Sequence, residues 1–180
     1  MTKLQGAMEF LIQTERLRLC KLNLDDAPFM VTLLNTPSWL KFIGDRGVRN
    51  TEDAEKYLLN GTMKSYETHG FGFYLMELKT DKTPIGICGL VKRDFLEHAD
   101  IGFALLPEFE GKGYGYEAAS ATLTYAKKTL GLKKIAAITV KENVNSIHLL
   151  EKLGLRFQKT VVYPDTQEEL LLYFISLENS

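Results

Sequence analysis

The sequence predicts an α/β (α+β) domain with a mostly antiparallel sheet flanked by helices, and three observations support this fold class. Residues 71–106 contain three successive strand-like apolar runs joined by short turns, as in an antiparallel meander. A helix over residues 114–130 and a strand over residues 133–140 follow, so a strand–helix–strand crossover makes two strands parallel. The 180 residues contain no repeat or linker, so we expect a single domain over residues 1–180 with a folded core over about residues 12–178.

The other elements follow from local patterns. Residues 12–22 alternate leucines with basic residues, which predicts a strand with one buried face. Asn23 can cap a helix after this strand, because its side-chain oxygen can accept hydrogen bonds from amides of the first turn. A further helix is expected over residues 51–68, where a His-Gly pair ends it. The last predicted elements are a short helix over residues 145–153 and a hairpin of residues 155–163 and 168–177.

Charge and cysteine content exclude several classes of protein. With 22 Lys+Arg and 23 Asp+Glu, the net charge of -1 provides no global positive field for a nucleic acid or an anionic membrane. No apolar run is long enough to span a bilayer, and the first residues lack the apolar segment of a signal sequence. Cys20 and Cys88 lack the spacing of a zinc or redox motif, so we expect small core residues in a cytoplasmic protein without a metal site.

Three glycines, Gly111, Gly113 and Gly115, alternate in EFEGKGYGYEAA just before the long helix. Glycines let backbone amides approach an anion closely, and a helix start adds partial positive charge, so the loop suits a phosphate or pyrophosphate. A simple tight turn is the alternative. A Walker loop is excluded because no Gly-Lys pair is followed by Ser or Thr at the required spacing, and a Rossmann fingerprint would need a third glycine that is missing.

Asn143 and Ser146 follow the next strand, at the end where parallel strand–helix units collect ligands. Together with TERLRL, IGDRGV, ADIGFALLPEFEGKGYGYEA and NSIHLLEKLGLRF, they make the chain resemble the GNAT superfamily of acetyl-coenzyme A dependent N-acetyltransferases. Within it, the chain is most similar to the ribosomal-protein N-terminal (RimJ/RimL-like) branch. The resemblance implies about seven strands, a bulged strand before the glycine loop, acetyl-CoA as co-substrate, and a protein N-terminal or small-molecule amine as acceptor.

The resemblance also implies a coenzyme A site built mainly from backbone. Amides of the glycine loop would hold the pyrophosphate, and the strand before the loop would pair with the pantetheine arm like an extra strand. Glu110 stands where the family has Gln or Arg, and we expect it to point away from the pyrophosphate. The implied cofactor residues are Phe103, Ala104, Leu105, Gly111, Lys112, Gly113, Tyr114, Gly115, Tyr116, Asn143 and Ser146.

Catalysis of this type is direct transfer, in which an amine loses a proton and the departing thiolate gains one. Many relatives use a tyrosine acid seven residues after the matching asparagine, but that position here is Leu150. Ser146, where the ribosomal-protein branch has a serine, is therefore the candidate acid, with a helix-capping serine as the alternative. Asp100 is the candidate base, because partial burial could raise its pKa toward a useful range. A water chain or simple solvation of the amine are the alternatives.

The acceptor side is assigned by the resemblance to the first two helices and the last hairpin. A packed cap over the sheet is the alternative interpretation of the same side chains. The residues concerned are Trp39, Phe42, Asp45, Arg46, Tyr66 and Tyr163. A non-catalytic acyl-coenzyme A binding module on the same fold is the alternative function, which Glu110 and Leu150 make conceivable. A homodimer is compatible with the resemblance, but no feature of the sequence selects it.

Overall fold

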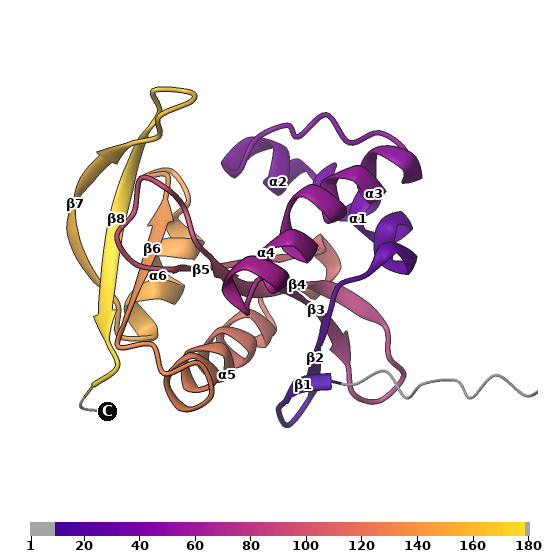
Figure 1. Ribbon diagram of the computed structural model, residues 1–180, viewed down its shortest axis with the longest axis horizontal. Coiled ribbons are helices and arrows are strands. Elements are labelled where there is room, and N and C mark those ends of the chain that lie inside the picture. Colours follow the sequence, from indigo (N-terminus) through magenta and orange to yellow (C-terminus); the bar gives the residue numbers. More distant parts are fainter. Residues whose placement is uncertain (1–9, 179–180) are drawn as a thin grey trace, which may run out of the picture.

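The computed structural model describes residues 10–178, in which eight strands form one sheet of order β1-β2-β3-β4-β5-β6-β8-β7 (Figure 1). All neighbouring strands are antiparallel except β5 and β6, so the predicted mostly antiparallel sheet with one parallel pair is confirmed, with eight strands instead of about seven. The expectation about the start of the chain falls on residues 1–9, outside the described residues. The strands are β1 (Phe10–Gln13), β2 (Leu17–Lys21), β3 (Phe73–Leu78), β4 (Pro84–Val91), β5 (Asp100–Leu105), β6 (Lys134–Thr139), β7 (Arg156–Val162) and β8 (Glu169–Ser176).

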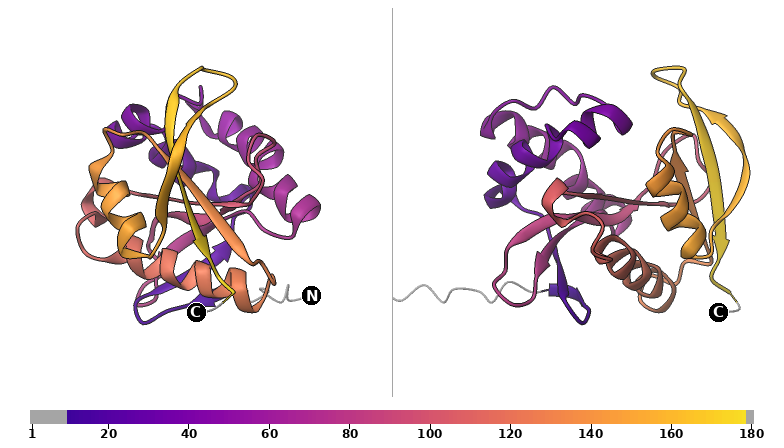
Figure 2. Two further views of the ribbon diagram at one scale, coloured as in Figure 1. Left: turned by 90° about the vertical axis from the view of Figure 1, so that its left-hand side faces the viewer. Right: turned by 180° about the vertical axis from the view of Figure 1, so that it is seen from behind.

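The helices lie on both faces of the sheet (Figures 1 and 2). One face packs against α1, α2 and α3, and the other packs against α5 and α6. Within residues 10–178, none of these helices has the length and apolar content needed to cross a membrane. The helices are α1 (Ala27–Leu34), α2 (Pro37–Phe42), α3 (Thr51–Asn60), α4 (Thr62–His69), α5 (Tyr114–Lys128) and α6 (Val144–Lys152), with short 3-10 helices η1 (Leu24–Asp26) and η2 (Pro107–Phe109).

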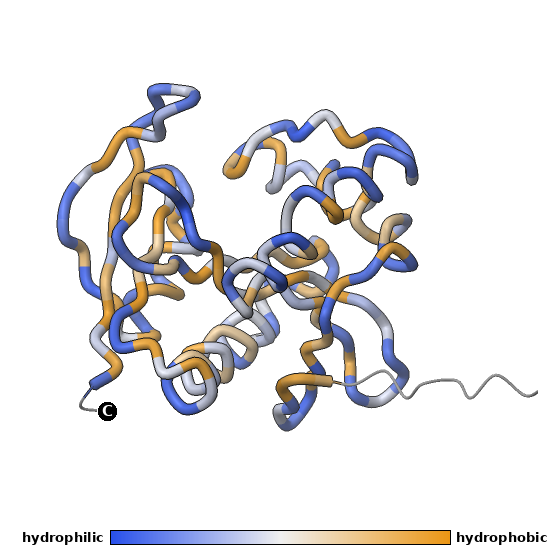
Figure 3. The backbone as a smooth tube through the Cα atoms, viewed as in Figure 1, coloured by the Kyte–Doolittle hydropathy of each residue, from blue (hydrophilic) through white to orange (hydrophobic). Residues whose placement is uncertain are grey.

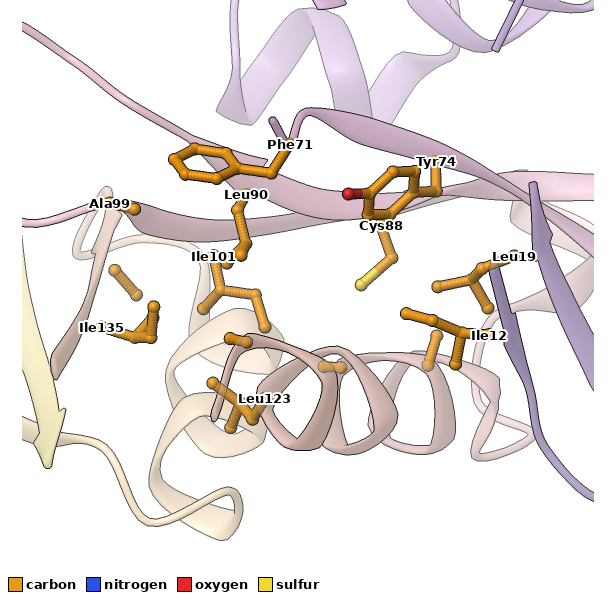
Figure 4. Close-up of a cluster of buried hydrophobic side chains, with 14 of the residues drawn as sticks. Ile12, Leu19, Phe71, Tyr74, Cys88, Leu90, Ala99, Ile101, Leu123 and Ile135 are labelled. Carbon is orange, nitrogen blue, oxygen red and sulfur yellow. The ribbon is translucent and has the colours of Figure 1, made fainter. Parts of the chain in front are cut away.

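Alternation along the strands builds a core on each face of the sheet. In β3, Tyr74 and Met76 join the cluster under α5, whereas Leu75 between them joins the cluster under α1 and α3. Figure 4 shows the first cluster, with Tyr74 and Cys88 on the side of the sheet and Leu123 on α5. Hydrophobic segments accordingly follow the central strands, while the outer loops are hydrophilic (Figure 3). The prediction that both cysteines are buried core residues is confirmed.

Two predicted elements are each divided in the structure. The expected strand over residues 12–22 is the β1–β2 hairpin, because the chain turns after Gln13 and the amide of Thr14 donates to the carbonyl of Leu17. The expected helix over residues 51–68 is α3 and α4, separated by Gly61, whose φ of -105° and ψ of -105° are not helical. Leucine alternation and helical spacing continue across both breaks, so periodicity alone does not reveal them.

Several local signals were interpreted correctly. Asn23 caps η1, which leads directly into α1, by accepting a hydrogen bond from the amide of Asp25. Gly70, with a φ of 79°, ends α4 in the left-handed conformation that favours glycine. The meander β3–β4–β5, the long helix α5, the short helix α6 and the final hairpin all appear where the sequence predicts them. Helix α2, capped by Thr36, is not among the predicted elements.

Candidate active site

A cavity of about 1050 Å³ lies where the sheet opens, between the helices α2 to α4 and the β7–β8 turn. Figure 1 shows these elements on opposite sides of β5. The lining residues include both catalytic candidates, Asp100 and Ser146, and three of the cofactor candidates, Phe103, Ala104 and Asn143. Leu105 and the glycine loop are not part of its lining. The structure therefore places the proposed acid and base on one cavity, and the glycine loop lies outside its lining.

The opening itself results from a change of partner by β6. Strands β5 and β6 pair at one position, Asp100 with Ala136, and then separate, while β6 pairs along its length with β8. Strand β5 keeps a ladder with β4 from Asp100 to Leu105 without a register shift. The prediction of a bulge in β5 is therefore wrong, because its pairing with β4 is regular. The opening forms instead because β5 and β6 separate after one pair.

The edge of β5 that faces the opening offers unpaired backbone groups. The carbonyl of Ala99 accepts from the amide of Ala136 at 2.9 Å, so backbone groups of odd-numbered residues point toward β6. The backbone groups of Ala104 point toward β4, and this residue can offer a ligand only its side chain. Beyond the single β5–β6 pair, the residues whose backbone groups face the opening are Phe103 and Leu105. This edge has the geometry to pair with an extended chain inserted between β5 and β6.

Asn143 and Ser146 have separate tasks at the start of α6. The side chain of Asn143 caps the helix by accepting a hydrogen bond from the amide of Ser146 at 3.2 Å. The capping alternative raised for Ser146 thus belongs to Asn143. The hydroxyl of Ser146 has no hydrogen-bond partner within residues 10–178 and lies on the cavity wall. Leu150, one turn further on, is buried and offers no proton.

Asp100 is the buried carboxylate of the cavity, with 2% of its surface exposed. Burial raises the pKa of Asp100 to about 6, although the guanidinium of Arg93 opposes the rise by donating from Nε to Oδ1 at 3.1 Å. A carboxyl group with this pKa is ionised above neutrality and still basic enough to take a proton. Arg93 also lines the cavity, so both the candidate base and its cation face the same space.

The glycine loop leads into α5 without a side-chain cap. Gly111 and Gly113 have φ values of 72° and 85°, the left-handed region in which other residues are strained. The amides of the first turn of α5 therefore have no side-chain acceptor, and the helix adds its partial positive charge there. Glu110 is exposed, and the ammonium of Lys112 lies 5.8 Å from the centre of the Phe109 ring. This loop is suited to hold a phosphate group.

The acceptor candidates divide into two groups. Four of them line the cavity: Trp39, Phe42, Arg46 and Tyr163. The other two have structural contacts elsewhere. Asp45 forms an ion pair with Arg49, and the Tyr66 hydroxyl accepts from the amide of Leu22 and donates to the carbonyl of Phe73. Within the described part of the chain, no three His, Cys, Asp or Glu side chains gather as metal ligands would.

Among the cavity residues that were not sequence candidates are Arg93 and Tyr57. Arg93 lies in the β4–β5 loop, seven residues before Asp100. The expected turn between these two strands is the only sequence signal that could have suggested their contact. Burial raises the pKa of the Tyr57 hydroxyl on α3, and the charges of Arg46 and Arg93 oppose that rise. The interaction of Tyr57 with Arg93 joins segments distant in sequence, so no local motif identifies it.

The site thus combines a split sheet, an uncapped helix start beyond it and a buried carboxylate in the adjoining cavity, an arrangement suited to group transfer. A family model described as "Acetyltransferase (GNAT) domain" matches residues 16–156, and the chain belongs to this family of acetyltransferases. The chain is 30% identical over 158 residues to the "Uncharacterized N-acetyltransferase p20" of Bacillus licheniformis, and the aligned region covers 87% of each protein.

Two solved structures share the fold. An acetyltransferase from Agrobacterium tumefaciens superposes with a TM-score of 0.78 at 23% identity, covering 97% of this chain and 98% of that one. RimL, a ribosomal L7/L12 alpha-N-protein acetyltransferase in complex with coenzyme A, superposes with a TM-score of 0.81 at 14% identity, covering 96% and 100%. The mixed, mostly antiparallel sheet with helices on both faces is thus the fold of acetyltransferases of this family.

Proposed function

We propose that this acetyltransferase moves an acetyl group from acetyl-CoA to a primary amine by direct transfer in a ternary complex. The observation that carries the proposal is the opening between β5 and β6. At one end it meets the uncapped start of α5, and at the other it meets the cavity that contains Asp100 and Ser146. An extended donor would match both ends, with its pyrophosphate at the start of α5 and its thioester at the cavity.

The residues of this chain would hold the donor mainly through backbone groups. Amides from Gly111 to Tyr116 would bind the pyrophosphate, since they begin a helix that has no side-chain cap. The edge of β5 at Phe103 and Leu105 would pair with the pantetheine arm. Bound in this way, the coenzyme supplies an acetyl group activated as a thioester. The coenzyme A complex of RimL, which has the same fold, supports this assignment.

The side chains of the cavity would manage two protons. Asp100 would accept the proton that the attacking amine loses as the C–N bond forms, and its pKa of about 6 keeps it ionised for this purpose at pH 7. The Ser146 hydroxyl would return a proton to the thiolate as the C–S bond breaks, directly or through water. Leu150 excludes the tyrosine acid of other relatives, so no other protein hydroxyl is proposed for this step.

The acceptor would enter from the face of the sheet covered by α2, α3 and α4. Its cavity combines Trp39 and Phe42 with charges of both signs, among them Arg46 and Asp94. The fold shared with RimL supports a protein α-amine and thus the ribosomal-protein branch. A small amine is the second candidate, because a cavity of about 1050 Å³ is also in the size range of small-molecule sites.

Thiol release tests the function. Purified protein mixed with acetyl-CoA is offered peptides with different N-terminal residues, polyamines, amino acids and aminoglycosides, and free thiol is measured together with the mass of the product. We expect thiol release that depends on one class of amine, with one acetyl group added to it. Binding of acetyl-CoA without thiol release across the whole panel would contradict the enzyme and support the alternative, a non-catalytic acyl-coenzyme A binding module.

A further inference from the structure

The turn between β1 and β2 touches the glycine loop through one side chain, Arg16. Its Nε donates to Oε2 of Glu117 at 2.7 Å, and its Nη1 donates to the carbonyl of Lys112 at 3.0 Å. Its guanidinium carbon lies 4.3 Å from the centre of the Tyr114 ring. Glu117, Lys112 and Tyr114 all belong to the loop and the first turn of α5, so a residue from the start of the chain contacts the proposed pyrophosphate site at three points.

The second partner in this contact is Glu117, whose two carboxylate oxygens are both occupied. Oε1 accepts from the Thr14 hydroxyl at 2.6 Å and from the amide of Arg16 at 2.8 Å, and Oε2 accepts from Nε of Arg16. Although burial opposes its charge, these donors from Thr14 and Arg16 hold the pKa of Glu117 below its usual range. A carboxylate in the first turn would otherwise compete with an incoming anion for the positive end of the helix. Here it is neutralised and directed toward the β1–β2 turn.

The bond to the Lys112 carbonyl has a geometric consequence. In a trans peptide the carbonyl and the following amide point in opposite directions, so a fixed Lys112 carbonyl also fixes the direction of the Gly113 amide. That peptide joins Lys112 to Gly113, and both Gly111 and Gly113 have positive φ and more backbone freedom than other residues. With no side-chain cap on α5, Arg16 provides the restraint that the loop lacks.

We propose that Arg16 is a positioning residue that prepares the glycine loop for the coenzyme pyrophosphate, an inference that rests on the proposed function. Its charge is already compensated by Glu117, so its contribution is the direction of the amides and not attraction of the phosphates. The Arg16 and Glu117 side chains are 41% and 18% exposed, and an ion pair this close to solvent contributes little to folding stability. A preformed loop, by contrast, spares the coenzyme the cost of ordering it.

Calorimetric titration with acetyl-CoA of the wild type, Arg16→Ala, Arg16→Lys and a control, Arg18→Ala, tests this role. Arg18 lies two residues further on, where its guanidinium is over the Phe10 ring instead of the glycine loop. We expect Arg16→Ala and Arg16→Lys each to weaken binding about tenfold, because lysine keeps the charge but cannot bridge Glu117 and the Lys112 carbonyl. The control should bind within about twofold of the wild type.

Two further measurements separate positioning from a structural role. The KM for acetyl-CoA should rise about tenfold while kcat stays within about twofold, since the reacting end is untouched. Without ligand, the amides of residues 111–116 should exchange hydrogen faster in Arg16→Ala, while the melting temperature changes little.

Each opposite result overturns a defined claim. Wild-type affinity in Arg16→Ala, or full affinity in Arg16→Lys, would overturn the positioning role, the second by showing that charge alone is sufficient. A loss of kcat with unchanged KM would also overturn it. A wild-type protein that does not bind acetyl-CoA would refute the proposed function itself, and this inference with it, which is distinct from a wild type and a variant that bind equally.

Discussion

The two halves of the site are built in different ways. The proposed donor half uses backbone groups from nearly consecutive residues, on the edge of β5 and in the loop that leads into α5. The proposed acceptor half uses side chains from α2, α3, the β4–β5 loop and the β7–β8 turn, which are far apart in sequence. In the proposed site, recognition of the donor is therefore local in sequence, whereas the choice of acceptor depends on long-range packing.

The proposed donor half would also allow a chain with a net charge of -1 to hold an anionic coenzyme. Oriented amides at one helix start would supply the positive potential, so a global basic surface would be unnecessary. In the acceptor half, charges of both signs meet in the cavity, and the buried carboxylate of Asp100 is balanced by Arg93. Changes in the donor half should therefore affect the KM for acetyl-CoA, and changes in the acceptor half should affect kcat and the response to pH.

The largest expected effect is that of Asp100→Asn. Because the proposed base acts as a carboxylate, the wild-type rate should rise as the pH increases through about 6, the pKa to which burial raises Asp100, and then level off. Asp100→Asn should lower kcat/KM about 100-fold and remove this limb, with acetyl-CoA affinity retained. A pH–rate profile of both proteins between pH 5 and 9 measures the effect.

Stability provides a check on the same variant. A carboxyl pKa raised in the folded state contributes stability that is complete below pH 4 and is lost as the pH rises through about 6. Asp100→Asn removes that loss, and its amide oxygen can still accept from Arg93, so the melting temperature at pH 8 should not fall. The matched control is Glu97→Gln, an exposed carboxylate of the same β4–β5 loop that does not line the cavity. An unchanged pH profile in Asp100→Asn would assign the proton to water.

The next largest effect concerns the donor half, in Gly113→Ala. The φ of 85° is unfavourable for alanine, and the added Cβ would lie 3.2 Å from Nη2 of Arg16. We expect acetyl-CoA affinity to fall about 30-fold, because the loop must adopt another shape. Calorimetric titration measures this.

Gly131→Ala is the control for backbone strain. Gly131 has a φ of 66° at the far end of α5, and a Cβ there meets nothing within 4 Å. Both variants should lose about 1 kcal/mol of stability, but only Gly113→Ala should lose affinity. If both variants bind acetyl-CoA with equal affinity, the glycine loop is a simple turn and not part of the donor site.

The sequence predicted the backbone elements of the donor half better than the long-range packing of the acceptor half. The meander, the crossover and the glycine loop are encoded by periodicity and by residues with restricted or unusual backbone preferences, and these were predicted. The bulge in β5 was wrong because pairing in a sheet depends on the partner strand, and here β6 leaves β5 for β8. Gly61 divides α3 from α4 without changing the apolar spacing, which is why one helix was expected there.

Side-chain roles were harder to predict than backbone sites. Arg16 was interpreted only as the polar face of a strand, although it contacts Glu117 across 101 residues. Tyr66 was placed in the acceptor site, but its hydroxyl bridges Leu22 and Phe73 inside the fold. Aromatic and charged residues of a given segment can point to either side, and only the packed structure decides which of them a ligand meets.

The smallest expected effect on activity is that of Ser146→Ala, at the boundary of the two halves. Because Asn143 caps α6, removal of the Ser146 hydroxyl should leave the melting temperature unchanged and lower kcat about tenfold, with little change in the KM for acetyl-CoA. Asn143→Ala is the informative partner: it removes the cap, so it should cost about 1 kcal/mol of stability. Steady-state kinetics and thermal unfolding of both variants distinguish the roles. If Ser146→Ala loses stability and keeps its kcat, the hydroxyl is structural, and the thiolate takes its proton from water.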